Sequence, residues 1–258
     1  MTARNIKTAE GGARLSPADI VENFGDLHPP MSAAQAIADA ARCLYCYDAP
    51  CINACPTQIN IPTFIHQIRS GNLDGSARTI LSANIMGGTC ARACPTEVLC
   101  EQACVVNHTE GEPIKIGLLQ RHAVDHLMAK RGPHPFARAR ESGLHFAVIG
   151  SGPAGLSFAH RASTLGHQVT VFERDQKPGG LNEYGLAAYK MVDDFAQREV
   201  EFLLQIGGIE IKAGKSLGKD FSLDELRKKY DAVFIGAGLT RPTRLDAPGV
   251  TLSGVRNA

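Results

Sequence analysis

Apolar and polar positions follow one pattern before residue 135 and another after it, and the two halves predict different structures. In the first half, apolar residues recur at helical spacing. This pattern predicts four helices, at Met31–Arg42, Pro62–Ser70, Leu73–Ala83 and Pro113–Lys130. In the second half, short apolar runs that favour strands alternate with helical stretches, an order typical of a parallel sheet covered by helices.

The second half predicts four strands and two helices. The strands are expected at His145–Ile149, Gln168–Phe172, Ile209–Lys212 and Ala232–Ile235, and the helices at Pro153–Leu165 and Val192–Ile206. A stretch rich in glycine and proline, Arg131–Pro135, is expected to link the halves. We therefore expect a surface arm over residues 1–30, a helical domain over 31–131 and a second domain over 140–258.

One polar residue interrupts the apolar face of the last helix in the first half. Ile116, Leu119, Ala123 and Leu127 lie at helical spacing, and Gln120 falls among them. A glutamine on this face needs a hydrogen-bonding or ligand partner. The sequence leaves open which kind of partner it has.

Composition narrows the function classes. The chain has 258 residues, 44% of them hydrophobic, and a formal net charge of +1. This balance argues against a nucleic-acid or membrane-surface partner chosen by bulk charge. No apolar run is long enough to span a membrane, and the N-terminus lacks the apolar core of a signal peptide. We therefore expect a cytoplasmic protein.

Eight cysteines, all within 62 residues, are the most informative feature of the composition. The first cysteine group is Cys43, Cys46, Cys51 and Cys55, and the second cysteine group is Cys90, Cys94, Cys100 and Cys104. In a reducing compartment such groups are more often metal or cofactor ligands than disulfides. The first group, which ends in Cys55-Pro56, resembles the ferredoxin run that binds [4Fe–4S] clusters.

Two [4Fe–4S] clusters are the favoured interpretation, and zinc is the main alternative. Structural zinc sites usually pair two Cys-x-x-Cys knuckles, and only Cys43 and Cys46 have that spacing. A non-enzymatic zinc scaffold beside a vestigial nucleotide fold remains possible on the residues alone.

A glycine motif, Gly150-Ser151-Gly152-Pro153-Ala154-Gly155, lies between a predicted strand and a predicted helix. Its three glycines permit a tight turn, approach of a pyrophosphate and close helix–strand packing. Glu173 ends the next strand, where an acidic side chain can bind a ribose hydroxyl. The motif predicts a dinucleotide site.

Two further glycine pairs follow this motif. Gly179-Gly180-Leu181 permits a second close backbone approach to the nucleotide. Gly236-Ala237-Gly238 is either a third contact or a plain turn after the last strand.

The cysteine groups, followed by VIGSGPAG and FERDQKPGGL, resemble the glutamate synthase small-subunit family of flavoprotein reductases, and within it the dihydropyrimidine dehydrogenase branch. The resemblance implies an α+α/β chain, in which an all-helical double [4Fe–4S] domain precedes part of a Rossmann-like FAD-binding domain. It implies FAD contacts at Gly150, Ser151, Gly152, Pro153, Ala154, Glu173, Gly180, Leu181 and Leu217.

The resemblance also divides the ligands between two clusters. It implies one ligand set of Cys43, Cys46, Cys51 and Cys104, and a second of Cys55, Cys94, Cys100 and Gln120. Cys90 is then a spare packed thiol. In the competing arrangement Cys90 is the fourth ligand and Gln120 is not a ligand.

The function implied by the resemblance is electron transfer from NAD(P)H through FAD and the two clusters. The acceptor would be an FMN-containing partner subunit that reduces uracil or thymine. Because no second glycine motif follows Gly155, the remaining NAD(P)H-binding part is expected on another stretch of polypeptide. No side chain here is expected to be the acid or base of pyrimidine reduction. The alternative is the small subunit of NADPH-dependent glutamate synthase, and Gln120 favours the pyrimidine branch.

Overall fold

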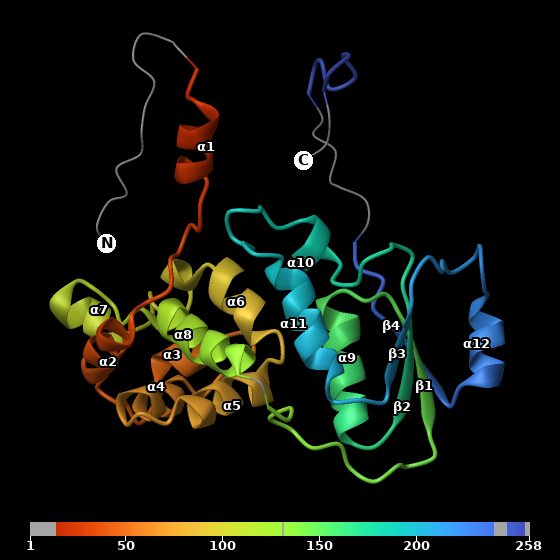
Figure 1. The fold of residues 1–258 in the computed structure, drawn as a ribbon, viewed down its shortest axis with the longest axis horizontal. Coiled ribbons are helices and arrows are strands. Elements are labelled where there is room, and N and C mark those ends of the chain that lie inside the picture. Colours follow the sequence, from red (N-terminus) through yellow and green to blue (C-terminus); the bar gives the residue numbers. More distant parts are fainter. Residues whose placement is uncertain (1–13, 131, 240–246, 256–258) are drawn as a thin grey trace.

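The computed structural model describes residues 14–130, 132–239 and 247–255, with a helical half beside a half built on a sheet (Figure 1). Several expectations fall outside the described residues. These are residues 1–13 of the expected arm, Arg131 of the expected linker, and residues 240–246 and 256–258 of the expected second domain.

The helical half contains short helices around one apolar core. They are α1 (Pro17–Asn23), α2 (Ala33–Ala41), α3 (Pro50–Asn53), α4 (Ile61–Arg69), α5 (Leu73–Ala83), α6 (Gly87–Ala93), the 3-10 turn η2 (Thr96–Val98), α7 (Val105–Glu110) and α8 (Ile116–Ala129). The four predicted helices are confirmed as α2, α4, α5 and α8, with ends shifted by up to three residues. Phe64, Ile80 and Leu119 are fully buried where α4, α5 and α8 pack together.

Side-chain caps explain where several of these helices begin. Ser32 and Gln35 form a reciprocal capping box at the start of α2. Asn60 and Asn72 accept hydrogen bonds from the first turns of α4 and α5. The helix starts are therefore encoded locally, before any tertiary contact.

The expected surface arm contains α1, which buries no residue. The segment after α1 bonds to both halves of the chain. Asp26 forms a bidentate ion pair with Arg121 on α8, at 2.9 and 2.6 Å. The backbone N–H of Leu27 donates to the carbonyl of Tyr189, at 2.8 Å, in the other half.

The second half is a four-stranded parallel sheet in the order β3-β2-β1-β4. Its elements are β1 (His145–Ile149), α9 (Pro153–Thr164), β2 (Gln168–Phe172), α10 (Leu181–Tyr184), α11 (Phe195–Leu204), β3 (Ile209–Lys212), α12 (Leu223–Lys229) and β4 (Ala232–Ile235). All four predicted strands are confirmed with the expected bounds.

Alternation along β1 separates two apolar layers. Val148 faces the core under α9, whereas Ala147 and Ile149 pack with Leu226 of α12 on the opposite face. Helix α11 is shorter than the predicted Val192–Ile206, because the two aspartates before Phe195 adopt positive φ angles of 59° and 53°.

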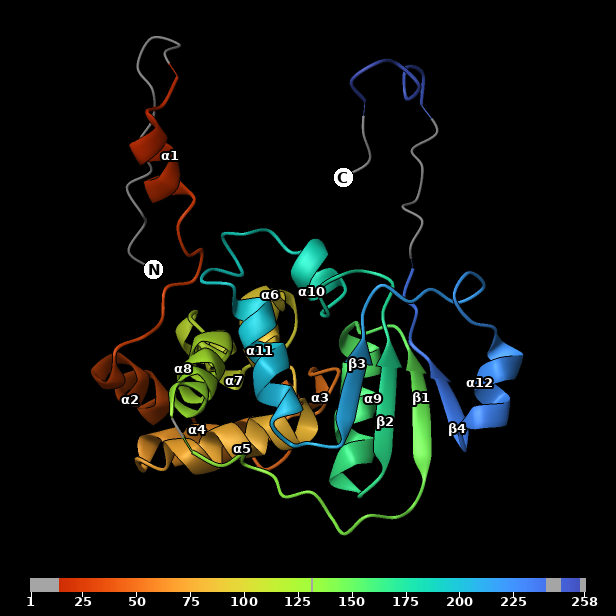
Figure 2. The same ribbon diagram turned by 45° about the vertical axis from the view of Figure 1, so that its right-hand side comes forward.

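Helix α11 lies between the helical half and α9 (Figure 2). Its Val200 and Leu203 are buried in the same cluster as Leu119 of α8 and Leu156 of α9. The two halves therefore share a continuous apolar core. Within residues 14–130, 132–239 and 247–255, no helix is both long and apolar enough to cross a membrane.

Candidate cofactor sites

Two glycines of the loop between β1 and α9, Gly150 and Gly155, leave no room for a Cβ. Gly150 has a φ of +94°, and a Cβ there would lie 2.5 Å from the carbonyl oxygen of Gly236. A Cβ on Gly155 would collide with the carbonyl oxygen of Gly150. Gly236, after β4, is therefore a close-packing position beside this loop.

Gly152 differs from these two, because the space beside it is open. A Cβ on Gly152 would meet only the Cα of Gly180, at an ordinary 3.9 Å. Gly180 has a φ of +55°, and the N–H of Gly179 donates to the carbonyl of Ser151 at 3.0 Å. The two glycine loops thus face each other beside the free N–H groups of α9, an arrangement that fits a pyrophosphate.

Glu173 contacts the glycine loop directly. Its Oε2 accepts from the backbone N–H and the hydroxyl of Ser151, at 2.8 and 2.5 Å, and its Oε1 accepts from the N–H of Asp175 at 2.9 Å. Burial opposes ionisation of this carboxyl, but the hydrogen bonds from Asp175 and Ser151 outweigh it and lower the pKa of Glu173. The carboxylate therefore orders the loop, a role that the motif alone did not predict.

The remaining expected FAD contacts lie in three other places along the chain. Pro153 and Ala154 are exposed in the first turn of α9, and Leu181 is exposed at the start of α10. Leu217 is 43% exposed and forms a parallel bridge with Phe221, in the segment after β3.

The first ligand set comes together from distant parts of the sequence. Burial, followed in size by the charges of Cys104 and Cys43, raises the pKa of the Cys51 thiol to about 11. Burial also raises the pKa of Cys43, to which the charges of Cys104 and Cys46 add. Cys104 is thus a near neighbour of two cysteines from the first group, Cys43 and Cys51, and Cys46 is a neighbour of Cys43.

The three cysteines of the second ligand set lie near one another, and one of them, Cys94, caps the C-terminal end of α6. Burial, and then the charges of Glu101 and Cys55, raise the pKa of Cys100 to about 12. The pKa of Cys94 is raised by its hydrogen bond to Cys90, by burial, and by the charges of Cys90, Cys100 and Cys55. Cys55, Cys94 and Cys100 are therefore neighbours.

Cys90 and Gln120, the two candidates for the fourth ligand, both lie beside the three cysteines of this second set. The pKa of Cys90 is lowered to about 7 by its hydrogen bond with Cys94; burial opposes this shift and a hydrogen bond from Gln120 adds to it. Gln120 is buried and donates through Nε2 to the carbonyl of Gly87, at 2.8 Å. Both candidates for the fourth ligand are thus present.

The donor set suits thiolate-bound clusters better than a single metal ion. All eight cysteines are free thiols. Within the described part of the chain, no three His, Cys, Asp or Glu side chains converge on one ion. A [4Fe–4S] cluster instead offers separate iron atoms, each of which takes one thiolate, so its ligands lie farther apart. The eight free cysteines are therefore compatible with cluster ligands.

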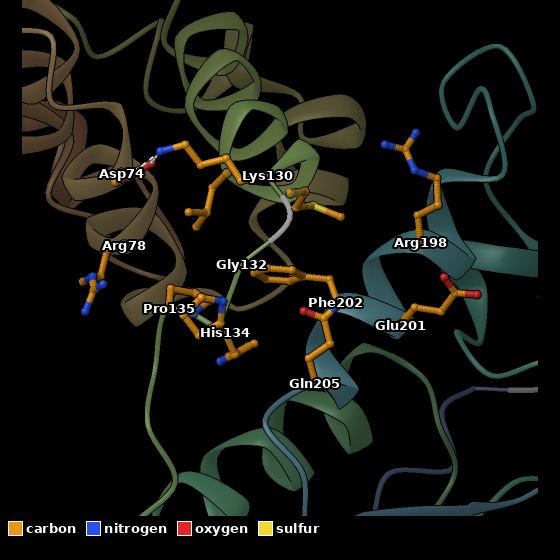
Figure 3. A pocket seen from close by; sticks show the side chains of 13 residues that line it. Asp74, Arg78, Lys130, Gly132, His134, Pro135, Arg198, Glu201, Phe202 and Gln205 are labelled. Carbon is orange, nitrogen blue, oxygen red and sulfur yellow. Dashed lines mark hydrogen bonds and ion pairs between the residues drawn. The ribbon is translucent and has the colours of Figure 1, made fainter.

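A separate cavity of about 390 Å³ lies where α5, α8 and α11 meet the segment after Gly132 (Figure 3). Lys130 on its wall is paired with Asp74, at 2.6 Å. The cavity contains neither the cysteine sets nor the glycine loop.

Two buried charged residues, one on α6 and one on the adjacent α11, were not predicted from the sequence. Glu199 on α11 is only 1% exposed, and Arg92 on α6 is 5% exposed. A signal was available for Glu199, because it lies four residues after Phe195 and three before Phe202, on the apolar face of its helix.

Family comparisons divide the chain as the structure does. Residues 20–132 match the family model described as dihydropyrimidine dehydrogenase domain II, 4Fe-4S cluster. Residues 144–258 match the model described as pyridine nucleotide-disulphide oxidoreductase.

Relatives with curated descriptions point the same way. The NAD-dependent dihydropyrimidine dehydrogenase subunit PreT homolog of Salmonella typhi is 36% identical over 222 residues, which are 85% of this chain and 52% of the relative. Subunit PreT of Escherichia coli (strain K12) is 34% identical over 220 residues, 85% of this chain and 53% of the relative. The putative oxidoreductase AegA of the same strain is 33% identical over 236 residues, 91% of this chain and 36% of the relative.

The chain spans about half the length of the two PreT relatives. The matches confirm the expected order of a helical iron–sulfur domain before a nucleotide-binding domain. They also confirm the expected cofactors of this combination, which are 4Fe–4S clusters, FAD and NAD(P)H. Residues 20–132 therefore match the dihydropyrimidine dehydrogenase 4Fe-4S family and residues 144–258 match the pyridine nucleotide-disulphide oxidoreductase family, so the chain combines an iron–sulfur domain with a nucleotide-binding domain.

Proposed function

We propose that this chain transfers electrons from NAD(P)H, through FAD and two [4Fe–4S] clusters, to an FMN-containing partner subunit that reduces uracil or thymine. The observation that carries the proposal is the position of the second ligand set. It contacts α6, α6 packs against α11, and α11 packs against α9, the helix that begins at the glycine loop. Packed helices therefore connect the two proposed cofactor regions.

The proposed ligand sets are those that the family resemblance implied. The first is Cys43, Cys46, Cys51 and Cys104, and the second is Cys55, Cys94, Cys100 and Gln120. Because Gln120 uses Nε2 to bond Gly87, its ligand atom would be Oε1. Oxygen is a harder ligand than thiolate, so this choice would distinguish the second cluster from the first.

For the flavin, the chain supplies binding and orientation. We propose contacts at Gly150, Ser151, Gly152, Pro153, Ala154, Glu173, Gly180, Leu181 and Leu217. The N–H groups of α9 would receive the pyrophosphate, and the Ser151–Glu173 hydrogen bonds would hold the loop in shape for it. When bound, the flavin would supply two-electron redox chemistry and the clusters would supply one-electron transfer.

Anaerobic purification with analysis of iron, sulfide and flavin tests the cofactor content. We expect eight iron atoms, eight sulfides and at most one FAD per chain. Stoichiometric zinc without sulfide would overturn the proposal.

Co-purification tests the partner. We expect an FMN-containing subunit that reduces uracil or thymine to the 5,6-dihydro base. A large amidotransferase subunit in its place would identify the glutamate synthase branch.

A further inference from the structure

The contact between α6 and α11 contains a buried carboxylate that the proposed function leaves unexplained. Glu199 accepts hydrogen bonds from the backbone N–H of Gly88, at 2.8 Å, and of Thr89, at 3.0 Å. It also accepts from the hydroxyl of Thr89. Three donors from the first turn of α6 thus converge on one carboxylate from the other half of the chain.

The backbones of the two helices approach closely at this point. A Cβ on Gly88 would collide with the ring of Phe195 and would lie 2.8 Å from Oε1 of Glu199. The guanidinium of Arg92 lies over the Phe195 ring, at 3.4 Å from its centroid, and is paired with Asp125 of α8 at 2.8 Å. Neither helix can slide here without breaking several buried contacts.

The same turn of α6 contacts the proposed second ligand set. Gly87, next to Gly88, accepts the hydrogen bond from Nε2 of Gln120 at 2.8 Å. At the other end of the helix, Cys94 is the C-terminal cap of α6. Glu199 therefore bonds to a helix that contacts two proposed ligands, one at each end.

We propose that Glu199 is a positioning residue for electron transfer: through Gly88 and Thr89 it fixes α6, and with it the second ligand set, at one separation from the nucleotide loop. This inference rests on the proposed function. Removing a carboxylate from water costs free energy, and hydrogen bonds must offset that cost. Glu199 is buried, and Gly88 and Thr89 provide these hydrogen bonds. Electron transfer weakens steeply with separation, so a loosened α6 would slow it.

The electron balance of the reaction does not change. Two electrons leave the reduced flavin one at a time, each is accepted by one cluster, and two protons are released. Glu199 gains or loses nothing in this step. Its effect is on rate and on the surroundings of the second cluster.

The test compares four variants of the anaerobically purified holoprotein. Glu199→Gln keeps the shape of the side chain but places an amide where the carboxylate accepts. Thr89→Val removes the hydroxyl and keeps the shape, and Thr89→Ser keeps the hydroxyl. Glu201→Gln, on the exposed face of the same helix, is the matched control.

Three readouts are measured on each variant. They are the electron paramagnetic resonance spectrum and reduction potential of each cluster, the rate of cluster reduction after light-driven flavin reduction, and hydrogen exchange of peptide 87–93. We expect Glu199→Gln and Thr89→Val to alter the spectrum or potential of one cluster. We also expect them to slow its reduction several-fold and to speed exchange at Gly88 and Thr89. Thr89→Ser and Glu201→Gln should resemble the wild type.

The inference would be overturned if Glu199→Gln matched the wild type in its cluster spectra, its cluster reduction potentials, its rate of cluster reduction and its hydrogen exchange. If Glu199→Gln loses iron, the two Thr89 variants test the inference instead. A change in Thr89→Val that is absent from Thr89→Ser supports the inference. Wild-type behaviour in both variants overturns it. Failure of the proposed function is recognised separately, because the wild-type protein would then contain no clusters or would not reduce them from its flavin.

Discussion

Glu173, at the end of β2, bonds twice to Ser151 in the loop after β1, through the backbone N–H at 2.8 Å and the hydroxyl at 2.5 Å. The acidic residue of a dinucleotide motif is expected to face the ribose. Here the same carboxylate also shapes the loop that would receive the pyrophosphate. Loop order thus depends on Glu173, and the proposed nucleotide contact would depend on the same side chain.

Substitution of Glu173 tests this dual role. We expect Glu173→Gln to weaken FAD binding about tenfold, equivalent to about 1.4 kcal/mol, because an amide nitrogen must then face a backbone or hydroxyl donor. Flavin titration measures the effect. Glu210→Gln, on the exposed side of β3, is the control. Wild-type flavin affinity in Glu173→Gln would contradict the role.

A substitution at Gly152 can test cofactor binding without disturbing the fold. We expect Gly152→Ala to fold with wild-type stability, since its Cβ would meet only Gly180 at 3.9 Å. The same methyl group would occupy the approach of the pyrophosphate, so flavin content should fall while iron content stays unchanged. Gly132→Ala, which has open space around it, is the control. A flavin-replete Gly152→Ala protein would show that the nucleotide binds elsewhere.

The fourth ligand of the second cluster is tested by two alanine variants. We expect Gln120→Ala to lose iron or to change the paramagnetic spectrum of one cluster, and Cys90→Ala to keep eight iron atoms. Iron and sulfide analysis, with spectra of the reduced protein, measures both. Loss of iron in Cys90→Ala alone would make Cys90 the ligand and Gln120 a buried residue bonded to Gly87.

The Asp26–Arg121 ion pair gives an acid-sensitive contribution to stability. Burial opposes ionisation of Asp26, but the hydrogen bond and charge of Arg121 outweigh it and lower the pKa of Asp26. Its contribution is present above the unfolded pKa of about 3.8 and is lost as the pH falls through the lower folded value. We expect Asp26→Asn to cost about 2 kcal/mol at pH 7.

Urea unfolding at several pH values measures this contribution. The difference between the wild type and Asp26→Asn should shrink below pH 4. Asp224→Asn, in the exposed pair with Arg227, should differ little from the wild type. A cost for Asp26→Asn that is independent of pH would show that the ion pair is not the cause.

His160 also makes stability fall as the pH drops, but at a higher pH than Asp26 does. It is buried, and its Nε2 has no hydrogen-bond partner among the described residues. Burial, with the nearby His134 and Arg161, lowers the pKa of His160 from 6.5 to about 4. The unfolded chain therefore binds more protons between these values, so stability falls as the pH drops through this window.

We expect the wild type to lose about 2 kcal/mol through His160 between pH 7 and pH 5. His160→Phe should remove that part of the pH dependence, and the exposed His108→Phe should not. Thermal unfolding at both pH values measures it. An unchanged slope in His160→Phe would contradict the assignment.

Elements with a clear apolar pattern were predictable from the sequence, and short helices without one were not. All four strands and helix α5 have the expected bounds, because apolar runs and capping residues encode them locally. Helix α6 starts with Gly87 and Gly88, which disfavour a helix, and contacts with Glu199 stabilise it from the other half. No local pattern reports such a contact.

The candidate sites also differ in how far the local sequence predicted them. The glycine loop was predictable because strand, turn and helix are consecutive in the sequence. The neighbours of Cys104 were not predictable from spacing, because Cys43 and Cys51 come from the other end of the helical half, and only the family resemblance grouped them.

The two cysteine sets are interleaved along the sequence. Cys55 lies between Cys51 and Cys104 of the first set, yet its neighbours are Cys94 and Cys100. Clusters bound by these sets would therefore close overlapping loops of chain. Insertion of the first cluster would then bring the ligands of the second closer together.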